Sequence, residues 1–269
     1  MKLPCYDTVI LSDLHLGSEV SRARAALQLL KTICFRRLIL LGDIFCDLNF
    51  RRLKKEHWQF LGYIRKLSNP KRNVEVVWVE GNHDRGLTDV MSHLVGVEVW
   101  QEYMWEFRGI HHLAIHGHQF DRFVINNLPF SNLLTLLYLQ LQRLDFGQKR
   151  FARLFDRLDT AWLRLSGKVS AGALAHAQER RATRVFCGHT HEAMRLESNG
   201  VEYFNCGSWT QASATYITID EEGVQIHEYA ERADDCHTGE ERGDTASAPA
   251  EVAEPAGLSA DAEYEGVRC

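Results

Sequence analysis

The chain has 269 residues, of which 45% are hydrophobic, 25% charged and 10% aromatic, and its formal net charge is −5. This composition is typical of a globular protein and excludes a collagen, a disulfide-rich mini-protein and a wholly disordered chain. No apolar run approaches the roughly 20 residues that cross a bilayer, and no long apolar stretch precedes Asp13, so neither an integral membrane protein nor a secretory signal is expected. The seven cysteines are scattered and form no C-x-x-C pair, which argues against a disulfide framework and favours a reducing compartment, the cytoplasm.

Apolar, β-branched runs alternate with helical patterns through the first half of the chain. In chain order, the pattern predicts a strand, a helix, a strand, a helix and a strand at residues 6–12, 19–34, 37–41, 54–67 and 74–79. A β-α-β-α-β order predicts a parallel sheet with helices packed outside it.

Short strands dominate the later part of the chain. They are expected at residues 111–115, 184–187, 192–197, 201–205, 216–220 and 224–229. The turns Asn199-Gly200 and Glu222-Gly223 predict antiparallel hairpins within the last four strands. The fold class is therefore predicted to be α/β, a mixed sandwich.

Residues 122–184 interrupt this rhythm, because most of the segment has a helical pattern. The segment carries a net charge of +7, and residues 128–141 are largely apolar but too short and too polar to span a membrane. Such an insertion could cover a site as a lid, rest on an anionic membrane, or simply pack on the core as a helical pair. We expect one domain over residues 1–230 that contains this insertion.

Residues 231–269 form a tail with a net charge of −8 that is rich in Ala, Glu, Gly, Ser and Pro. A segment of this composition cannot bury enough apolar surface to offset its ordering entropy, so we expect a disordered, solvated tail. The rest of the chain then has a net charge of +3. This is less positive charge than a non-specific nucleic-acid binder carries, so no nucleic-acid partner is expected.

Polar, metal-ligating side chains directly follow five of the expected strands. The motifs are Asp13-Leu14-His15, Gly42-Asp43 with Asp47, Gly81-Asn82-His83-Asp84, His116-Gly117-His118 and Gly188-His189-Thr190-His191. Open α/β sheets place ligands at the carboxyl ends of their strands, so these groups are expected to converge. Carboxylate, amide and imidazole donors without thiolate suit Mn²⁺, Fe²⁺, Zn²⁺ or Co²⁺. The set is large enough for two ions, which could clamp a phosphate and activate water.

The five motifs, in this order, resemble those of the calcineurin-like metallophosphoesterase superfamily. The resemblance covers about residues 6–230 and implies a four-layer αββα sandwich with a helical insertion. It also implies two divalent ions, with Mn²⁺ expected. The ligands would be Asp13, His15 and His191 for one ion, Asn82, His116 and His189 for the other, and Asp43 as the bridge.

The same resemblance assigns two catalytic residues. His83 would donate a proton to the leaving oxygen or stabilise charge on the phosphate, and Asp84 would orient its imidazole. His118 is expected to lie behind the ligands rather than to bind metal. The implied reaction is direct hydrolysis by an in-line attack of activated water, without a covalent intermediate.

Within the superfamily, the layout is similar to the bacterial UDP-2,3-diacylglucosamine diphosphatases of lipid A synthesis. Those enzymes release UMP and 2,3-diacylglucosamine 1-phosphate, and their helical insertion holds the acyl chains. The apolar residues 128–141 and the basic insertion suit such a substrate, with peripheral contact at the cytoplasmic face of the inner membrane. One residue differs, because His83 stands where those diphosphatases commonly have arginine.

Two other functions remain open from the sequence. One is hydrolysis of a soluble nucleotide or another phosphomonoester or phosphodiester, which an insertion without an apolar chamber would favour. The other is a non-catalytic, metal-dependent scaffold. Scaffolds of this kind usually lose motif residues, and here every motif residue is present.

Overall fold

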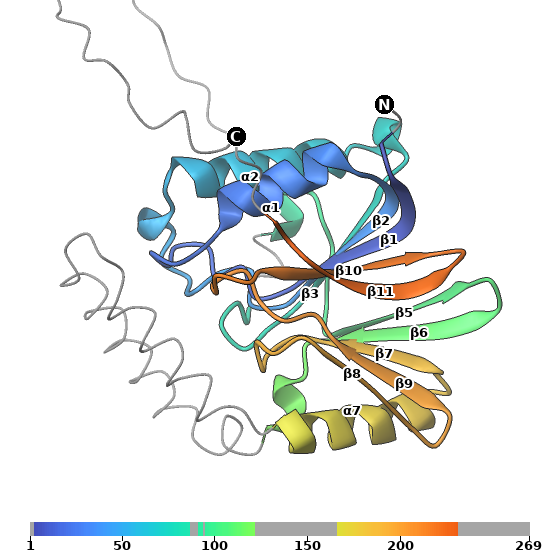
Figure 1. Cartoon of the computed structure of the whole chain (residues 1–269). Helices are drawn as coiled ribbons and strands as arrows, with labels where there is room; N and C mark the ends of the chain where they lie inside the picture. Colours follow the sequence, from blue (N-terminus) through green and yellow to red (C-terminus); the bar gives the residue numbers. More distant parts are fainter. Residues whose placement is uncertain (1–2, 87–90, 94, 122–165, 231–269) are drawn as a thin grey trace, which may run out of the picture. The chain divides into compact units, whose positions relative to one another are not determined.

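The computed structural model describes residues 3–86, 91–93, 95–121 and 166–230 (Figure 1). These residues belong to one compact unit, Met1–Glu231. Most of the expected lid, residues 122–165, and the expected disordered tail, residues 231–269, lie outside the described residues.

The first sheet has six strands in the order β11-β10-β1-β2-β3-β4. Its strands are β1 (Cys5–Leu11), β2 (Cys34–Leu41), β3 (Glu75–Val79), β4 (Val99–Trp100), β10 (Thr215–Asp220) and β11 (Gly223–Glu228). The strands β1 to β4 run parallel, and the β10–β11 hairpin adds to β1 in the antiparallel sense. The parallel arrangement of β1, β2 and β3 brings their carboxyl ends to one edge of the sheet, as the sequence predicts.

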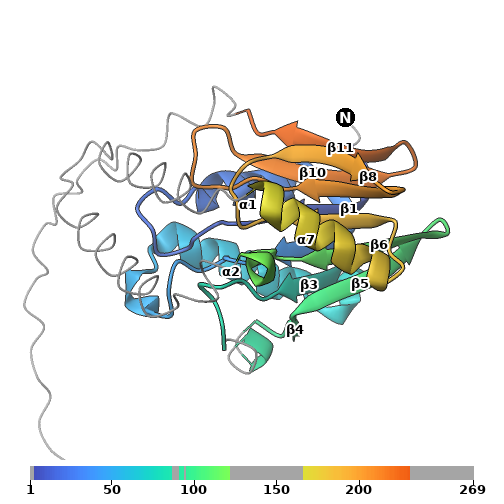
Figure 2. The ribbon, with the colours of Figure 1, turned by 90° about the horizontal axis from the view of Figure 1, so that it is seen from below.

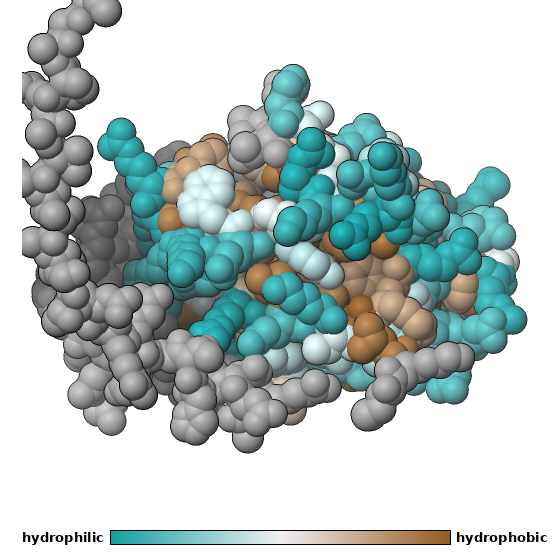
Figure 3. Space-filling view, turned by 90° about the horizontal axis from the view of Figure 1, so that it is seen from above, coloured by the Kyte–Doolittle hydropathy of each residue, from teal (hydrophilic) through white to brown (hydrophobic). Residues whose placement is uncertain are grey.

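Two helices, α1 (Ala23–Thr32) and α2 (Lys55–Leu67), cover the outer face of this sheet (Figure 1). Their apolar residues recur at helical spacing, so that Ala26, Leu30 and Ile64 are buried against the sheet. The opposite faces of the helices meet solvent, and hydrophilic side chains cover much of the described surface on that side (Figure 3).

The second sheet has five strands in the order β5-β6-β7-β9-β8. They are β5 (Glu102–Phe107), β6 (Ile110–Ile115), β7 (Arg184–Cys187), β8 (Met194–Ser198) and β9 (Val201–Asn205). The central strands β6, β7 and β9 are parallel, whereas β5 and β8 are antiparallel edges. Helix α7 (Ser166–Glu179) packs across the outer face of this sheet (Figure 2).

The inner faces of the two sheets pack against each other through an apolar core, which is separate from the apolar layers between each sheet and its helices. Ile39, Val79 and Phe186 are among its fully buried members. The layers therefore run helices, sheet, sheet, helix, which confirms the predicted αββα sandwich. The predicted hairpins β8–β9 and β10–β11 are also confirmed.

Strands β4 and β5 are not among the elements predicted from the sequence, whereas helix α7 falls within the segment 122–184, for which a helical pattern is expected, although its own bounds are not predicted. Strand β5 (Glu102–Phe107) is a half-exposed edge strand that mixes hydrophobic and charged residues. It therefore contains no continuous apolar run that would reveal it in the sequence. Helix α7 is rich in alanine and buries small residues such as Ala173 and Ala177, which give a weak amphipathic pattern.

Cys5 and Cys34 form a disulfide, with their Cα atoms 4.5 Å apart. The two residues are paired in register where β1 and β2 begin. The prediction from the scattered cysteines did not foresee this bridge, because the linear spacing does not reveal the register of two parallel strands. The cysteines therefore give no support to a reducing compartment. Among the residues that the structure describes, no helix has the length and apolar character needed to span a bilayer.

Candidate metal centre

The motif residues gather where five strands end. Loops after β1, β2, β3, β6 and β7 supply them, and backbone hydrogen bonds tie these loops together. The amide of Asp13 donates to the carbonyl of Gly42 at 3.1 Å, the amide of His15 to that of Asp43 at 3.0 Å, and the amide of Gly188 to that of His116 at 3.1 Å. The two sheets thus hold one continuous rim of ligating side chains.

The backbone at this rim adopts an unusual conformation. Five of the seven expected metal ligands have a positive φ: Asp13 (53°), His15 (47°), Asp43 (50°), His189 (66°) and His191 (56°). Left-handed backbone is uncommon for residues other than glycine and costs free energy. Its concentration here indicates that the fold turns these side chains toward one place, which is typical of a functional site.

Two glycines allow the loops to approach one another closely. A Cβ atom at Gly81 would overlap the backbone nitrogen and Oδ1 of Asp43, and one at Gly188 would overlap Ser12 Oγ and Asp13 Oδ2. Only glycine fits these two positions without displacing the carboxylates. The glycines in the G-N-H-D and G-H-x-H motifs therefore belong to the architecture of the site.

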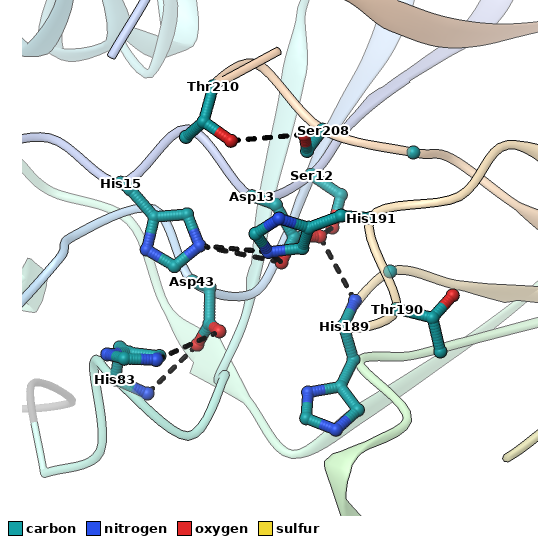
Figure 4. Close-up of polar contacts among 12 residues, drawn as sticks. Ser12, Asp13, His15, Asp43, His83, His189, Thr190, His191, Ser208 and Thr210 are labelled. Atoms are coloured by element: carbon teal, nitrogen blue, oxygen red, sulfur yellow. Dashed lines mark hydrogen bonds and ion pairs between the residues drawn. The ribbon is translucent and has the colours of Figure 1, made fainter. Parts of the chain in front are cut away.

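One group of three side chains forms around Asp13 (Figure 4). Its Oδ1 lies 3.0 Å from Nε2 of His191 and 3.8 Å from Nε2 of His15, and the two imidazole nitrogens are 3.1 Å apart. The three ligand atoms face one another within 4.8 Å, which is the arrangement that a single cation needs.

The second oxygen of Asp13 is held by the protein. Oδ2 accepts hydrogen bonds from Ser12 Oγ and from the amide of His189, and Ser12 Oγ also contacts the Leu41 carbonyl at 2.7 Å. Burial opposes ionisation of Asp13, but the adjacent His191 outweighs it and keeps the pKa of Asp13 below its usual value. The carboxylate is thus fixed in orientation, with Oδ1 left for a cation.

A second group of three combines Asp43, His116 and His189, whose ligand atoms also lie within 4.8 Å of one another. Oδ2 of Asp43 is 3.2 Å from Nε2 of His116. Nδ1 of His116 donates to the Leu41 carbonyl at 3.0 Å, which directs Nε2 to the site. Although burial opposes the charge, Asp43 raises the pKa of His116 to about 10, so that without a cation the ring would hold a proton in its place.

His189 is oriented by Asp121, a residue that our sequence analysis missed. Asp121 is fully buried, and its Oδ2 lies 3.2 Å from Nε2 of His189. Because this carboxylate accepts from Nε2, Nδ1 of His189 remains to bind a cation. The only signal in the sequence is an acidic residue five positions after His116, in the same strand-end loop.

Asn205 is a second missed residue, and it supports the G-H-x-H loop. Its amide donates to the Gly188 carbonyl at 2.6 Å and to Thr190 Oγ1 at 3.1 Å. Asn205 is fully buried at the end of β9, and its position is set by the parallel pairing of β9 with β7.

His83 stands beside Asp43 at the edge of the centre (Figure 4). Its amide donates to Asp43 Oδ1 at 2.9 Å, its Nε2 is 3.9 Å from Asp43 Oδ2, and its ring makes an edge contact with His15. Nδ1 of His83 contacts the carbonyl of Cys46 at 2.9 Å. The Cys46 carbonyl therefore orients this imidazole.

Asp84 does not have the role that the sequence suggested for it. Its two oxygens accept hydrogen bonds from the amides of Ile44 at 2.9 Å and Gly81 at 2.6 Å. Asp84 thus ties the loop after β2 to the loop after β3, instead of orienting the His83 ring. Burial and the nearby Asp43 raise the pKa of Asp84 to about 6.

The remaining motif residues also lie at this rim. Asn82 precedes His83, and its Oδ1 is buried. His118 is 3% exposed and packs behind His116 and His189, with ring centroids 5.5 and 6.4 Å away. Burial, reinforced by His116, lowers the pKa of His118 to about 2.

These residues fit a pair of divalent cations. Among the described residues, Asp13 Oδ1, Asn82 Oδ1 and His116 Nε2 are buried and form no hydrogen bond of good geometry, and the close polar neighbours of Asp13 Oδ1 and His116 Nε2 are other expected ligands. Buried polar atoms are nearly always satisfied, so such a concentration indicates that a bound group completes their coordination. Oxygen and imidazole donors suit divalent transition metals. The thiol of Cys46 is not a competing nucleophile, because burial raises its pKa to about 12.

Solved structures that are similar to this chain include two phosphoesterases and a Vps29 protein. An archaeal phosphodiesterase has 15% sequence identity and a TM-score of 0.46, covering 82% of this chain and 98% of that one. The phosphoesterase Yfce from E. coli has 18% identity and a TM-score of 0.44, covering 81% and 90%. A Vps29 mutant from Entamoeba histolytica has 14% identity and a TM-score of 0.41, covering 82% and 97%.

No curated protein sequence matches the chain. The family model described as the calcineurin-like phosphoesterase superfamily domain matches residues 7–223, which include all five motifs. The chain therefore belongs to the calcineurin-like phosphoesterase superfamily.

Proposed function

We propose that the protein hydrolyses a phosphoester or pyrophosphate at a dinuclear metal centre. The observation that carries the proposal is the convergence of two three-residue groups, one around Asp13 and one around Asp43, at a single rim. Asp13, His15 and His191 hold one ion and Asn82, His116 and His189 the other, with Asp43 between them. Mn²⁺ is the ion we propose, because the donor set combines carboxylate, amide and imidazole.

When bound, the two ions supply Lewis acidity and an activated water. The protein supplies orientation and proton transfer. Because Nδ1–H of His83 donates to the Cys46 carbonyl, Nε2 is the ring nitrogen left to face the phosphate. From this position, Nε2 can interact with a phosphate oxygen or take part in proton transfer to the leaving oxygen.

For the substrate, we propose UDP-2,3-diacylglucosamine, cleaved to UMP and 2,3-diacylglucosamine 1-phosphate. The support comes from the sequence of the insertion, in which an apolar stretch at 128–141 stands within a segment of net charge +7. Such a segment suits acyl chains next to an anionic head and the cytoplasmic face of an inner membrane. A soluble nucleotide or another phosphoester is the alternative, because His83 replaces the arginine common in those diphosphatases.

The test is to incubate the Mn²⁺-loaded protein with UDP-2,3-diacylglucosamine and to measure UMP. UDP-N-acetylglucosamine, which lacks the two long acyl chains, is the matched control. Release of UMP from the acylated substrate alone would support the lipid substrate. Equal cleavage of both would favour a soluble pyrophosphate. Hydrolysis of neither compound nor of simple phosphoesters would contradict the proposed activity.

A further inference from the structure

Arg85 lies at the rim of the metal centre in contact with His118. It follows the Gly81-Asn82-His83-Asp84 motif directly, and its Nη2 is 3.3 Å from Nε2 of His118. His118 in turn packs against the expected ligands His116 and His189. Arg85 therefore lies beside the centre and is joined to the ligand rings through His118.

The contact with Arg85 fixes the tautomer of His118. A guanidinium can only donate hydrogen bonds, so Nε2 of His118 must accept and its proton must sit on Nδ1. That Nδ1 is buried and has no hydrogen-bond partner among the described residues. A buried donor without an acceptor marks a place that an oxygen of a ligand or of an ordered water completes.

The guanidinium of Arg85 is exposed to solvent and forms no ion pair with another described residue. Arg85 is exposed, and in the described part of the chain no carboxylate lies within ion-pair distance of it. Only one of its five N–H donors is engaged by His118. Within the described residues, the guanidinium thus has N–H donors left over beside the ring that packs on His116 and His189.

The charge balance of the centre explains why such a group is useful. Four carboxylates are buried there, those of Asp13, Asp43, Asp84 and Asp121. Their four negative charges offset those of two divalent cations. An additional positive charge is needed to attract and hold a doubly charged anion, and Arg85 is positioned to provide it.

We propose that Arg85 binds a phosphate oxygen of the substrate and that His118 positions its guanidinium for this purpose. The ligand class is a phosphoryl group with two negative charges, as in a phosphomonoester or a pyrophosphate. This inference deepens the proposed function and rests on it for the identity of the reaction. The binding of phosphate itself can be tested without turnover.

The first experiment measures inorganic phosphate binding to the Mn²⁺-loaded protein by calorimetry. Arg85→Met should raise the Kd of phosphate about 10-fold or more, because a charge-assisted bidentate contact is lost. Arg85→Lys should recover only part of the affinity, since an ammonium lacks the planar fork. Arg36→Met, which removes an exposed arginine from β2, is the matched control and should leave the Kd unchanged.

The second experiment separates positioning from a merely structural role. His118→Phe keeps the ring volume and removes both nitrogens, so it should weaken phosphate binding while metal content and Tm stay close to those of the wild type. In the double variant with Arg85→Met, the loss should not exceed that of Arg85→Met alone, because the two residues act as one unit. Additive losses would overturn the positioning role.

A third measurement needs neither metal nor substrate. Nitrogen NMR of the metal-free full chain should show His118 protonated at Nδ1, and Arg85→Met should shift the population toward the Nε2–H tautomer. An Nε2–H ring in the wild type would overturn the proposed contact. An unchanged phosphate Kd in Arg85→Met with both metals retained would overturn the role of Arg85. If the wild type bound phosphate as predicted but hydrolysed no phosphoester, the proposed reaction would be contradicted. The role of Arg85 and His118 in phosphate binding would still be supported.

Discussion

Asp121 Oδ2 lies 3.2 Å from Nε2 of His189, and both side chains are almost fully buried. The carboxylate fixes the ring so that only Nδ1 can meet a cation, and it raises the basicity of that nitrogen. We therefore expect Asp121 to contribute to metal affinity, although it belongs to none of the five motifs.

Replacing Asp121 with asparagine should lower metal affinity by roughly 10- to 100-fold, because the amide cannot stabilise the imidazole as a carboxylate does. Titration of the metal-free protein with Mn²⁺ measures the effect. Glu102→Gln is a matched control, since Glu102 contacts His176 at 2.6 Å in a similar pair away from the motif residues. An Asp121→Asn protein with the affinity of the wild type would contradict this role.

His83→Ala should slow hydrolysis by about 10²- to 10⁴-fold while both metals stay bound, because His83 is proposed to transfer a proton and stabilise charge. Turnover and metal content are measured on the same preparation. Loss of a metal from this variant would identify His83 as a ligand instead.

The close approach at Gly188 gives a prediction about folding. Gly188→Ala would push a Cβ into Ser12 and Asp13, so it should destabilise the metal-free protein by about 2 kcal/mol or more and weaken metal binding. Gly62→Ala is the contrasting variant, because nothing lies within 4 Å of the added atom in the middle of α2. It should raise the free energy of unfolding by about 0.5–1 kcal/mol. Denaturant titrations measure the free energy of unfolding of the two variants. Similar changes in this free energy for both variants would contradict the close packing at Gly188.

Because of His112, we expect the free energy of unfolding to decrease in mild acid. Its ring is stacked between Trp105 and Phe186, Nε2 is buried, and burial lowers its pKa to about 4. Protonation therefore favours the unfolded chain, in which the pKa is higher. Stability from this group is full above about pH 6.5 and falls as the pH drops toward 4.

Between pH 7 and pH 5, His112 should account for about 2 kcal/mol of the decrease in unfolding free energy. His112→Phe keeps the stacked ring and removes the titrating group, so its stability should fall less over this interval. Urea titrations at both pH values measure the difference. Identical pH dependence in the two proteins would show that His112 is not the responsible group.

The fold and the ligand groups follow closely from local patterns in the sequence. Apolar strand runs and the glycine turns predict the parallel β1–β3 core and both hairpins, and the strand-end rule places Asp13 and Asp43 at one edge. The supporting residues do not follow, because they depend on which loops meet. Asp121 reaches His189 from another strand end, and Cys46 holds His83 through a carbonyl that no side-chain pattern marks.

The Cys5–Cys34 bridge and Arg85 illustrate the same limit. The bridge depends on the register of β1 against β2, and the reach of Arg85 to His118 depends on the relative placement of two loops. Both are relations between segments distant in the sequence, for which composition and periodicity give no signal.

The most direct test of the dinuclear centre is the metal content of the wild type and of Asp43→Ala after loading with Mn²⁺ and removal of excess ion. The wild type should retain two ions per chain, and Asp43→Ala should lose both ions and nearly all hydrolytic activity, because the Asp43 carboxylate lies within 4.8 Å of ligand atoms of His116 and also of His15. A wild type that binds no Mn²⁺, or an Asp43→Ala protein that keeps two ions and full turnover, would contradict the account.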